Sequence, residues 1–387
     1  MSADYASLRL KAKGDRARLD EILNMECRDK TRSKLARTLQ AAPDFRFPSL
    51  AVAEMATSDA IADIHAGLAG EGGRVADMTF GLGIDAFAFA RRASSVTAFD
   101  IVEANVEAGR TNSLQLGLDN VTLECADSVE WLRTHPEATF DTIFIDPARR
   151  DGTGRHFRIA DCLPDLTRWV DLLLERCGRL IVKLSPMLDI TASLNELGLT
   201  DSLKRQVDVV VTGLHNECKE LLLVIPGKLN GGVEENGKIR AVTVGRESFD
   251  FRPTDVPHSA PRYAKPEAGD VLLEPYPAVM KAGAISRLFD FEGVAALHPN
   301  THLFTAKEKP SDFPAKAFRI VEVLDFSSSL CKTFARTYPQ INVAARNFPL
   351  RAPELAKKLK VREGGEMQVF GVTTCDGKRL LVVTKPV

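Results

Sequence analysis

The chain has 387 residues, of which 44% are hydrophobic and 27% charged, so it is globular and long enough for two or three hydrophobic cores. Its formal net charge of −1 excludes a uniformly basic nucleic-acid-binding protein but leaves local basic patches open. The N-terminal residues lack the apolar core of a signal peptide, and no stretch holds the roughly 20 apolar residues of a membrane helix. We therefore expect a cytoplasmic protein that has no membrane partner.

The seven cysteines are scattered and form no CxxC pair, which favours neither a disulfide framework nor a zinc ribbon. The run HPNTH places His298 and His302 four residues apart, but Pro299 and Asn300 indicate a turn with structural histidines. We expect reduced, mostly buried thiols and no metal site.

Residues 1–70 are predicted to form a helical region, because leucines and isoleucines recur at helical spacing among charged residues. Between Arg9 and Arg37, ten Lys and Arg residues stand against five Asp and Glu residues. This local excess suits either a surface that faces phosphates or an ordinary solvated helix face.

Strands and helices alternate in residues 71–226, which predicts a parallel sheet covered by helices on both sides. The expected strands are 74–78, 95–101, 120–126, 139–146, 178–185, 206–213 and 220–226. The last two are joined only by LHNECK, which is too short for a helical crossover, so the final strand should run antiparallel to its neighbour. The fold class is therefore α/β, with a Rossmann-like, seven-stranded mixed sheet.

The composition and pattern of the sequence change after residue 226. Residues 227–269 are expected to form a linker with a β-hairpin, since Asn236-Gly237 is a two-residue turn signal and residues 252–268 are rich in Pro and polar groups. Residues 270–387 are expected to form an α+β domain closed by a hairpin at Asp376-Gly377. Its strands are expected near 271–273, 301–305, 317–324, 341–346, 367–374 and 379–384, and its helices at 277–290, 328–337 and 352–360.

Acidic residues follow four successive strands of the predicted sheet. They are Asp77, Asp100, Asp127 and Asp146, the last of them before Pro147. Ligands of open α/β sheets bind at the carboxyl ends of the strands, so these residues are candidates for one site. Each could instead cap the helix that follows it, which is the commoner role for a single aspartate at such a position.

The turn after the first strand indicates the kind of ligand. Gly81 and Gly83 let the backbone approach a ligand, and the helix that starts at Asp85 offers its N-terminus to the same cleft. GLGIDA also fits the dinucleotide pattern G-x-G-x-x-A, but Asp77 would put a carboxylate beside a pyrophosphate. A carboxylate there favours a cationic group, such as an α-amino group or a sulfonium.

S-adenosylmethionine is the cofactor that fits this arrangement. We expect its methionine end at Asp77 and Thr79, its ribose at Asp100 and its adenine near Asp127. Asp100 lies 23 residues beyond Asp77, close to the spacing at which an acidic side chain reaches a ribose hydroxyl pair.

The same residues carry a resemblance to a known class. The order D-x-T-x-G-x-G, Asp100, Asp127 and DPAR at 146–149 resembles the class I S-adenosylmethionine-dependent methyltransferases over roughly residues 50–226. Nearly the whole chain resembles a bacterial group of THUMP-like-domain methyltransferases with a ferredoxin-like C-terminal part. The runs that carry this second resemblance are FPSLAVAEMATSDAIADIHAGL, IDPARRD, EPYPAVMKAGAISRLF, LHPNTHLFT and ARNFPLRAPELAKKLKVREGG. The name of the group implies a link to RNA modification.

The residues after the fourth strand are expected to hold the methyl acceptor. Asp146 and Pro147 match the start of the D/N-P-P-aromatic motif of base-amine methyltransferases, but Ala148 and Arg149 replace its second proline and its aromatic residue. D-P-x-R also resembles the D-P-P-R of methyltransferases that act on C5 of uridine in RNA, in which a cysteine adds to the ring. Cys162 and Cys218 are the nearest cysteines, and a buried, inert thiol is the expected role of both.

The loop RRDGTGRHFR at 149–158 adds four arginines and His156 to the acceptor side, where they could bind phosphates or stack on a base. It could equally be a solvent-exposed loop in which Arg149 pairs with Asp146. We expect a methyltransferase with Asp146, Pro147 and Arg149 as catalytic residues and RNA as its acceptor and partner. The alternatives are a small-molecule or protein methyltransferase with the same cofactor site, and a non-catalytic RNA-binding protein with a residual cofactor pocket. The sequence does not indicate the oligomeric state.

Overall fold

The structure is a computed structural model that describes residues 4–149, 158–230 and 237–387. The chain divides into two compact units, each of which is described by itself below. The first comprises residues 1–212 and 219–239, and the second comprises residues 213–218 and 240–387.

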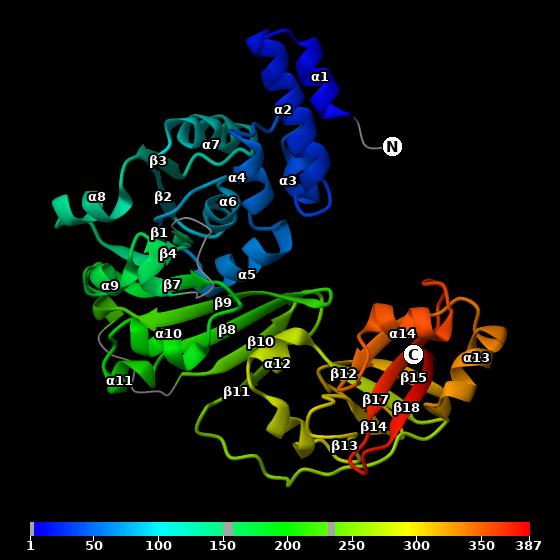
Figure 1. Ribbon diagram of the computed structural model, residues 1–387. Coiled ribbons are helices and arrows are strands. Elements are labelled where there is room, and N and C mark those ends of the chain that lie inside the picture. The colour runs from blue at the N-terminus through cyan, green and yellow to red at the C-terminus, as the bar shows by residue number, and fades with distance from the viewer. Residues whose placement is uncertain (1–3, 150–157, 231–236) are drawn as a thin grey trace. The chain divides into compact units, whose positions relative to one another are not determined.

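The first unit begins with short helices, drawn in blue in Figure 1. They are α1 (Tyr5–Lys11), α2 (Arg16–Thr31), α3 (Ala36–Ala41), α4 (Leu50–Met55) and α5 (Asp59–Ala69). Four of them start at a capping side chain that accepts a hydrogen bond from a backbone N–H of the first turn: Asp4, Asp15, Ser49 and Ser58. Buried Cys27 and Ile22 on α2 show that this helix has an inner face.

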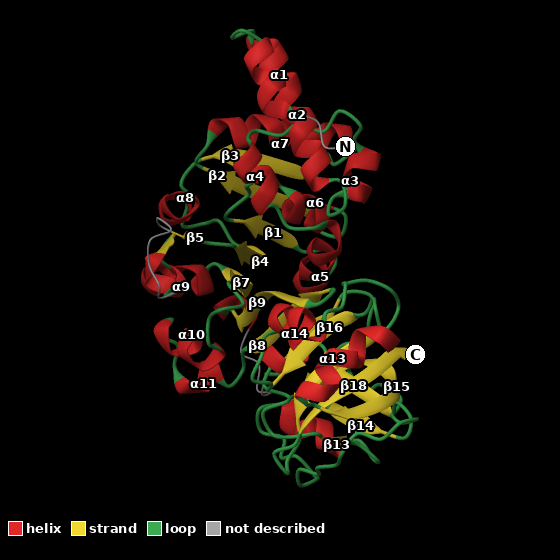
Figure 2. Ribbon diagram, turned by 45° about the vertical axis from the view of Figure 1, so that its right-hand side comes forward, coloured by secondary structure: helices red, strands yellow, loops and turns green. Residues whose placement is uncertain are grey.

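A nine-stranded sheet follows, in the order β11-β10-β8-β9-β7-β4-β1-β2-β3, in which the seven strands from β8 to β3 are those of the first unit. Figure 2 shows its strands in yellow, running from β3 past β1 and β4 to β7 and β9. The strands are β1 (Arg74–Asp77), β2 (Ser95–Asp100), β3 (Val121–Cys125), β4 (Phe140–Ile145), β7 (Cys177–Leu184), β8 (Asp208–Leu214), β9 (Glu217–Pro226), β10 (Ile239–Thr243) and β11 (Phe249–Phe251). β1 is parallel to β2 and β4, β2 to β3, and β4 to β7, whereas β7 and β9 are antiparallel.

Helices connect the parallel strands. They are α6 (Ile84–Ala90), α7 (Glu103–Gln115), α8 (Ser128–Thr134), α9 (Leu166–Glu175), α10 (Ile190–Glu196) and α11 (Asp201–Lys204), with the 3-10 turn η1 (Ile159–Asp161). A second 3-10 turn, η2 (Lys228–Asn230), follows the antiparallel strand β9. A two-stranded ribbon of β5 (Ala148–Arg149) and β6 (Cys162–Leu163) follows β4.

The expected α/β fold class and its mixed sheet are confirmed. The final strand of the predicted sheet runs antiparallel to β7, as the short connection required. All seven strands of the predicted sheet are present, as β1, β2, β3, β4, β7, β8 and β9, and β10 and β11 follow beyond β8. Asn236, in the expected hairpin turn, lies outside the described residues, whereas Gly237 donates its backbone N–H to the carbonyl of Arg205.

The second unit contains a seven-stranded sheet in the order β13-β14-β12-β15-β18-β17-β16. Its strands are β12 (Val271–Pro275), β13 (Ala295–Ala296), β14 (Phe304–Ala306), β15 (Ala315–Asp325), β16 (Asn342–Arg346), β17 (Gln368–Thr373) and β18 (Arg379–Pro386). Its helices are α12 (Pro277–Lys281), η3 (Ile285–Asp290), α13 (Ser328–Thr337) and α14 (Ala352–Leu359). The predicted hairpin at Asp376-Gly377 joins β17 to β18, with Gly377 at φ +77°.

The two faces of this second sheet carry separate apolar clusters, because successive strand residues point to opposite faces. Val369, Leu381 and Val383 pack with Phe334 of α13 and Leu355 of α14. Their neighbours Phe370, Leu380 and Val382 join Leu272 and Ile320 in the other cluster. The second unit is thus stabilised mainly by the burial of apolar side chains.

Candidate active site

The four acidic residues expected from the sequence reach one edge of the first sheet. Asp77 and Asp100 are the last residues of β1 and β2, Asp127 lies two residues beyond β3, and Asp146 directly follows β4. Because β4, β1, β2 and β3 are parallel neighbours, their carboxyl ends line the same edge. This is the position at which open α/β sheets bind ligands.

Asp77 is almost completely buried, with 1% of its surface exposed. Its Oδ1 accepts a hydrogen bond from the backbone N–H of Thr79 at 3.1 Å, whereas its Oδ2 is buried without any hydrogen-bond partner among the described residues. Burial, and then the nearby Asp85 carboxylate, raise the pKa of Asp77 to about 8. A buried carboxylate oxygen of this kind fits a donor from a ligand, above all a cationic one.

The glycine turn after β1 is held by Asp100. Gly81 donates its backbone N–H to Asp100 Oδ2 at 2.9 Å, and the side chain of Asn105 donates to the same oxygen at 2.9 Å. Gly83 adopts a φ of +84°, and a Cβ there would lie 2.3 Å from the ring of Phe80, so only glycine fits. Gly81 also has a positive φ, but a Cβ there would meet no atom within 4 Å, so its backbone faces open space.

Asp127 caps helix α8, since its Oδ1 accepts from the backbone N–H groups of Val129 and Glu130 at 3.0 Å each. Ile101 and Val102, which follow Asp100, are 74% and 47% exposed although both are apolar. Exposed apolar side chains between the end of β2 and the start of α7 suit a flat, uncharged ligand group such as a purine ring.

Asp146 is tied to the glycine turn and to the neighbouring strand. Its backbone N–H donates to the hydroxyl of Thr79 at 2.8 Å, and Lys183 Nζ on β7 donates to its Oδ2 at 2.5 Å. Pro147, the next residue, is buried. The Asp146 carboxylate therefore has a fixed position relative to β1 and β7.

Behind this edge lies a buried charge network of His65, Asp85, Glu220, Lys183 and Asp146. His65 Nδ1 lies 2.7 Å from Asp85 Oδ1, and its Nε2 lies 2.5 Å from Glu220 Oε1. Glu220 Oε2 lies 3.9 Å from Lys183 Nζ, which binds Asp146. The network joins α5, α6, β9, β7 and the residue after β4.

The charges of this network stabilise one another. Burial would lower the pKa of His65, but Glu220 and Asp85 outweigh burial and raise the pKa to about 10. Burial would raise the pKa of Asp85, but His65 outweighs it and holds that pKa below its ordinary value. His65 is thus a doubly protonated imidazolium at neutral pH, and both of its N–H groups donate to carboxylates.

Asp85 and Thr79, which the sequence predicts at the cofactor, both have protein partners in the structure. Asp85 Oδ2 accepts from the hydroxyl of Thr57 at 2.7 Å, in addition to the contact with His65. His65, Thr57, Lys183 and Glu220 were not among the predicted site residues. A signal was available for two of them: Lys183 interrupts the apolar run LIVKL, and Glu220 opens the run ELLLVIP, and charged residues are rarely buried unless they are paired.

Part of the expected acceptor loop lies outside the described residues. This holds for Arg150, Arg155 and His156, and nothing is described of the Arg149 side chain, although its backbone pairs with Cys162 in the β5–β6 ribbon. Arg158 Nε lies 3.3 Å from Glu196 Oε1. Cys162 is 8% exposed, and its thiol donates to the Arg158 carbonyl.

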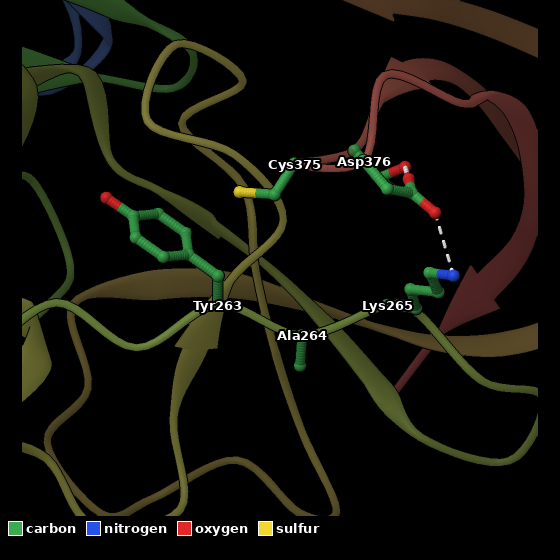
Figure 3. Close-up of a pocket in the computed structure, with 6 residues that line it drawn as sticks. Tyr263, Ala264, Lys265, Cys375 and Asp376 are labelled. Atoms are coloured by element: carbon green, nitrogen blue, oxygen red, sulfur yellow. Dashed lines mark hydrogen bonds and ion pairs between the residues drawn. The ribbon is translucent and has the colours of Figure 1, made fainter.

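Within the ranges that the structure describes, no helix is long and apolar enough to cross a membrane, and no cluster of ligating side chains could hold a metal ion. A hollow of about 170 Å³ in the second unit is lined by Tyr263, Lys265, Cys375 and Asp376, among others. Figure 3 shows that its two charged residues, Lys265 and Asp376, bind each other, at 2.8 Å. The hollow therefore presents no unmet charge to a ligand.

The C-terminal part of the chain matches two family models. One describes a ferredoxin-like domain over residues 272–314, and the other a THUMP domain-like region over residues 315–386.

Curated relatives cover different shares of the chain. A 23S rRNA (uracil(1939)-C(5))-methyltransferase RlmD of Alkalilimnicola ehrlichii is 45% identical over 80 residues, which is 20% of this chain and 18% of that protein. The protein of the same name from Salmonella typhi is 40% identical over 83 residues, 21% of this chain and 19% of that protein. An uncharacterized S-adenosylmethionine-dependent methyltransferase of Mycobacterium tuberculosis is 26% identical over 256 residues, 66% of this chain and 64% of that protein. The chain thus spans less than two thirds of the length of each of these relatives.

A solved structure from Porphyromonas gingivalis, described as a candidate methyltransferase, matches with a TM-score of 0.83 and 29% identity, over 99% of this chain and 97% of that one. The resemblance inferred from the motifs is therefore confirmed: the chain is a homologue of S-adenosylmethionine-dependent methyltransferases and carries ferredoxin-like and THUMP-like domains at its C-terminal end.

Proposed function

We propose that this chain is an S-adenosylmethionine-dependent methyltransferase of the cytoplasm whose acceptor is a base in RNA. The observation that carries the proposal is the buried Oδ2 of Asp77, which has no partner among the described residues and stands at the end of β1 beside the glycine turn. The α-amino group of S-adenosylmethionine is a cationic donor of the kind that this oxygen fits.

The residues that would hold the cofactor lie along the ends of β1, β2 and β3. Asp77 receives the ammonium group, Gly81 and Gly83 let the backbone approach the methionine end, Asp100 accepts from the ribose and Asp127 from the adenine amino group. Ile101 provides an apolar contact for the adenine ring. Thr79 and Asp85 act through their partners, since Thr79 holds the backbone of Asp146 and Asp85 binds His65.

When bound, the cofactor supplies an electrophilic methyl group on a sulfonium. The protein then has to align the acceptor and accept its proton. Asp146 suits both tasks, because 40% of its side chain is exposed at the edge of the sheet while its Oδ2 is held by Lys183. We assign Asp146 to the N–H or O–H of the acceptor, and Pro147 and Arg149 to its flanks.

Two observations support RNA as the acceptor. The RlmD relatives are named for a reaction on 23S rRNA, although they share only about a fifth of their length with this chain. The sequence after Asp146 is rich in arginine, and arginine binds phosphates and stacks on bases.

Labelled methyl transfer to total RNA from a strain that lacks this protein tests the proposal. We expect label in one RNA size class, lost with Asp146→Asn and retained with Asp141→Asn. Asp141 is the matched control, because it lies on the same strand β4 near its opposite end and is 62% exposed.

Two results would contradict the proposal, and a third would contradict only the assignment of Asp146 to an N–H or O–H of the acceptor. Label in protein or in small molecules would move the acceptor out of RNA. Binding of S-adenosylhomocysteine and RNA without any transfer would indicate a non-catalytic protein. Loss of transfer with Cys162→Ala or Cys218→Ala, with folding retained, would indicate that a thiol adds to the acceptor ring, as carbon methylation of a pyrimidine requires.

A further inference from the structure

Lys183 carries its charge in a largely buried position, where a cation is unfavourable unless neighbouring groups compensate for its desolvation. It is the penultimate residue of β7, a strand whose other residues are mostly buried and apolar, and only 14% of its side chain is exposed. Ile145 pairs with Val182 in the β4–β7 register, so the residues that follow them, Asp146 and Lys183, arrive side by side. Their contact therefore follows from the strand register itself.

Three oxygens surround the ammonium group of Lys183. Nζ donates to Asp146 Oδ2 at 2.5 Å and to Thr57 Oγ1 at 3.3 Å, and Glu220 Oε2 lies 3.9 Å away. Burial would lower the pKa of Lys183, but the Asp146, Asp85 and Glu220 carboxylates outweigh it and raise that pKa above its ordinary value. Lys183 is therefore a permanent cation at neutral pH and cannot act as a base.

The two oxygens of Asp146 differ in their surroundings. Lys183 binds Oδ2, and in the described ranges no hydrogen bond reaches Oδ1. The rest of the network keeps Lys183 in place: Thr57, which accepts from Lys183, donates to Asp85, and Asp85 and Glu220 are both bound to His65. Lys183 thus links the exposed carboxylate to a rigid, buried set of charges.

We propose that Lys183 is a positioning residue for methyl transfer: it holds the Asp146 carboxyl group in one orientation, with Oδ1 presented to the N–H or O–H of the acceptor. This proposal rests on the proposed function. In the reaction the acceptor atom gives its lone pair to the methyl carbon, the carbon–sulfur bond breaks with its electron pair on sulfur, and the acceptor proton passes to Asp146. Burial, and then the Asp85 and Glu220 carboxylates, raise the pKa of Asp146 above its ordinary value, and Lys183 opposes that rise. Removal of Lys183 therefore favours the protonated form of Asp146 further.

The experiment compares Lys183→Met with the wild-type protein on an RNA that the wild type labels. Lys183→Met should lower kcat by about 100-fold, because the acceptor is no longer aligned. The dissociation constant of S-adenosylhomocysteine, measured by calorimetry, should stay within about twofold of wild type. The acidic limb of the rate–pH profile should move up by at least about one pH unit, since Asp146 loses its cation.

Two further variants keep the test decisive. Lys228→Met is the matched control: Lys228 pairs with Glu175 at 2.9 Å in the same unit, but it follows the end of β9, which pairs with the beginning of β7, so it lies at the opposite edge of the sheet. It should leave kcat and the pH profile unchanged. If Lys183→Met does not fold, Lys183→Arg replaces it; this variant keeps the charge, so it should retain the pH profile and lose part of kcat.

The possible failures are distinguishable. A Lys183→Met protein with wild-type kcat and pH profile would overturn the positioning role and leave the proposed function intact. A large loss of cofactor affinity with an unmoved pH limb would show a merely structural role and also overturn it. If the wild-type protein transfers no methyl group to RNA, the proposed function itself fails.

Discussion

The first sheet gathers ionisable side chains at one edge, whereas the second sheet is covered on both faces by apolar clusters. Helices pack against strands in both arrangements, but the free energy of burying the side chains differs between them. Burial of apolar surface stabilises a fold directly, whereas a buried carboxylate or imidazolium needs a partner to offset its desolvation. Apolar side chains would stabilise the fold at this edge without such partners. The concentration of charged groups there therefore indicates a functional site.

Removal of the central cation of the network should have the largest effect. His65→Ala leaves Asp85 and Glu220 buried without the cation between them, and we expect it to destabilise the first unit by about 3–5 kcal/mol. Phe370→Ala in the second unit should cost a similar amount, about 3–5 kcal/mol, by cavity formation. Urea unfolding measures both, and a loss below about 1 kcal/mol for His65→Ala would show that the network is not a stabilising unit.

The pH dependence should separate these two losses. The pKa of His65 is about 10 in the folded chain and near its ordinary value of 6.5 in the unfolded chain, so the folded state holds a proton that the unfolded state releases between these values. Its contribution is complete below pH 6.5 and is lost as pH rises through about 10, which amounts to a few kcal/mol. Urea midpoints of the first unit at pH 6.5, 8 and 9.5 should fall in wild type and in Phe370→Ala. In His65→Ala they should fall less, and an equal slope in all three proteins would argue against a charged His65.

Asp77→Asn should weaken S-adenosylhomocysteine binding by about 1.5–3 kcal/mol, because it removes a charge-assisted hydrogen bond. The pKa of Asp77 is about 8, so its side chain is mostly protonated at pH 7, and an ammonium ligand has to displace that proton. Affinity should therefore rise with pH up to about 8 and then level off.

Calorimetry in phosphate and in Tris, two buffers with different ionisation enthalpies, measures the proton release directly. Wild type should release most of one proton at pH 7. Asp77→Asn should release none, and Asp119→Asn, at an exposed position, should behave as wild type. Equal binding enthalpies in both buffers for the wild type would rule out the exchange at Asp77.

The smallest effect is expected at Asp127, which combines a capping role with the proposed contact to adenine. Asp127→Ala should lose about 1 kcal/mol of stability, because the cap of α8 is removed. Asp127→Ser should restore most of that stability, since serine also caps, but it should bind S-adenosylhomocysteine as weakly as Asp127→Ala does. Wild-type affinity in the serine variant would reduce Asp127 to a helix cap.

The fold and the main edge of the site could be predicted because they depend on local order along the chain. Alternating strands and helices imply a parallel sheet, and parallel strands bring the residues that follow them to one edge, so Asp77, Asp100 and Asp146 could be grouped from sequence alone. The same order of residues along the chain carries the resemblance to S-adenosylmethionine-dependent methyltransferases, and this resemblance is confirmed.

The buried charge network could not be predicted in this way, because its members meet only through tertiary packing. His65 and Glu220 are 155 residues apart, and the first lies in a helix that precedes β1. Nothing in the helix pattern distinguishes His65 from an ordinary core histidine until Asp85 and Glu220 are seen at its two nitrogens. Likewise, the role of Asp100 in holding the glycine turn becomes visible only from its hydrogen bonds, whereas the capping of α8 by Asp127 is an alternative that the sequence leaves open.

Strand β9 runs against β7, so its first residues, rather than its last, arrive where the parallel strands end. This reversal allows a single hairpin to supply Glu220 to that edge without a further crossover helix. Glu220 therefore reaches this edge from a later segment of the chain than the glycine turn and the residue after β4. A substitution of Glu220 would therefore act in two directions, on Asp146 through Lys183 and on Asp85 through His65.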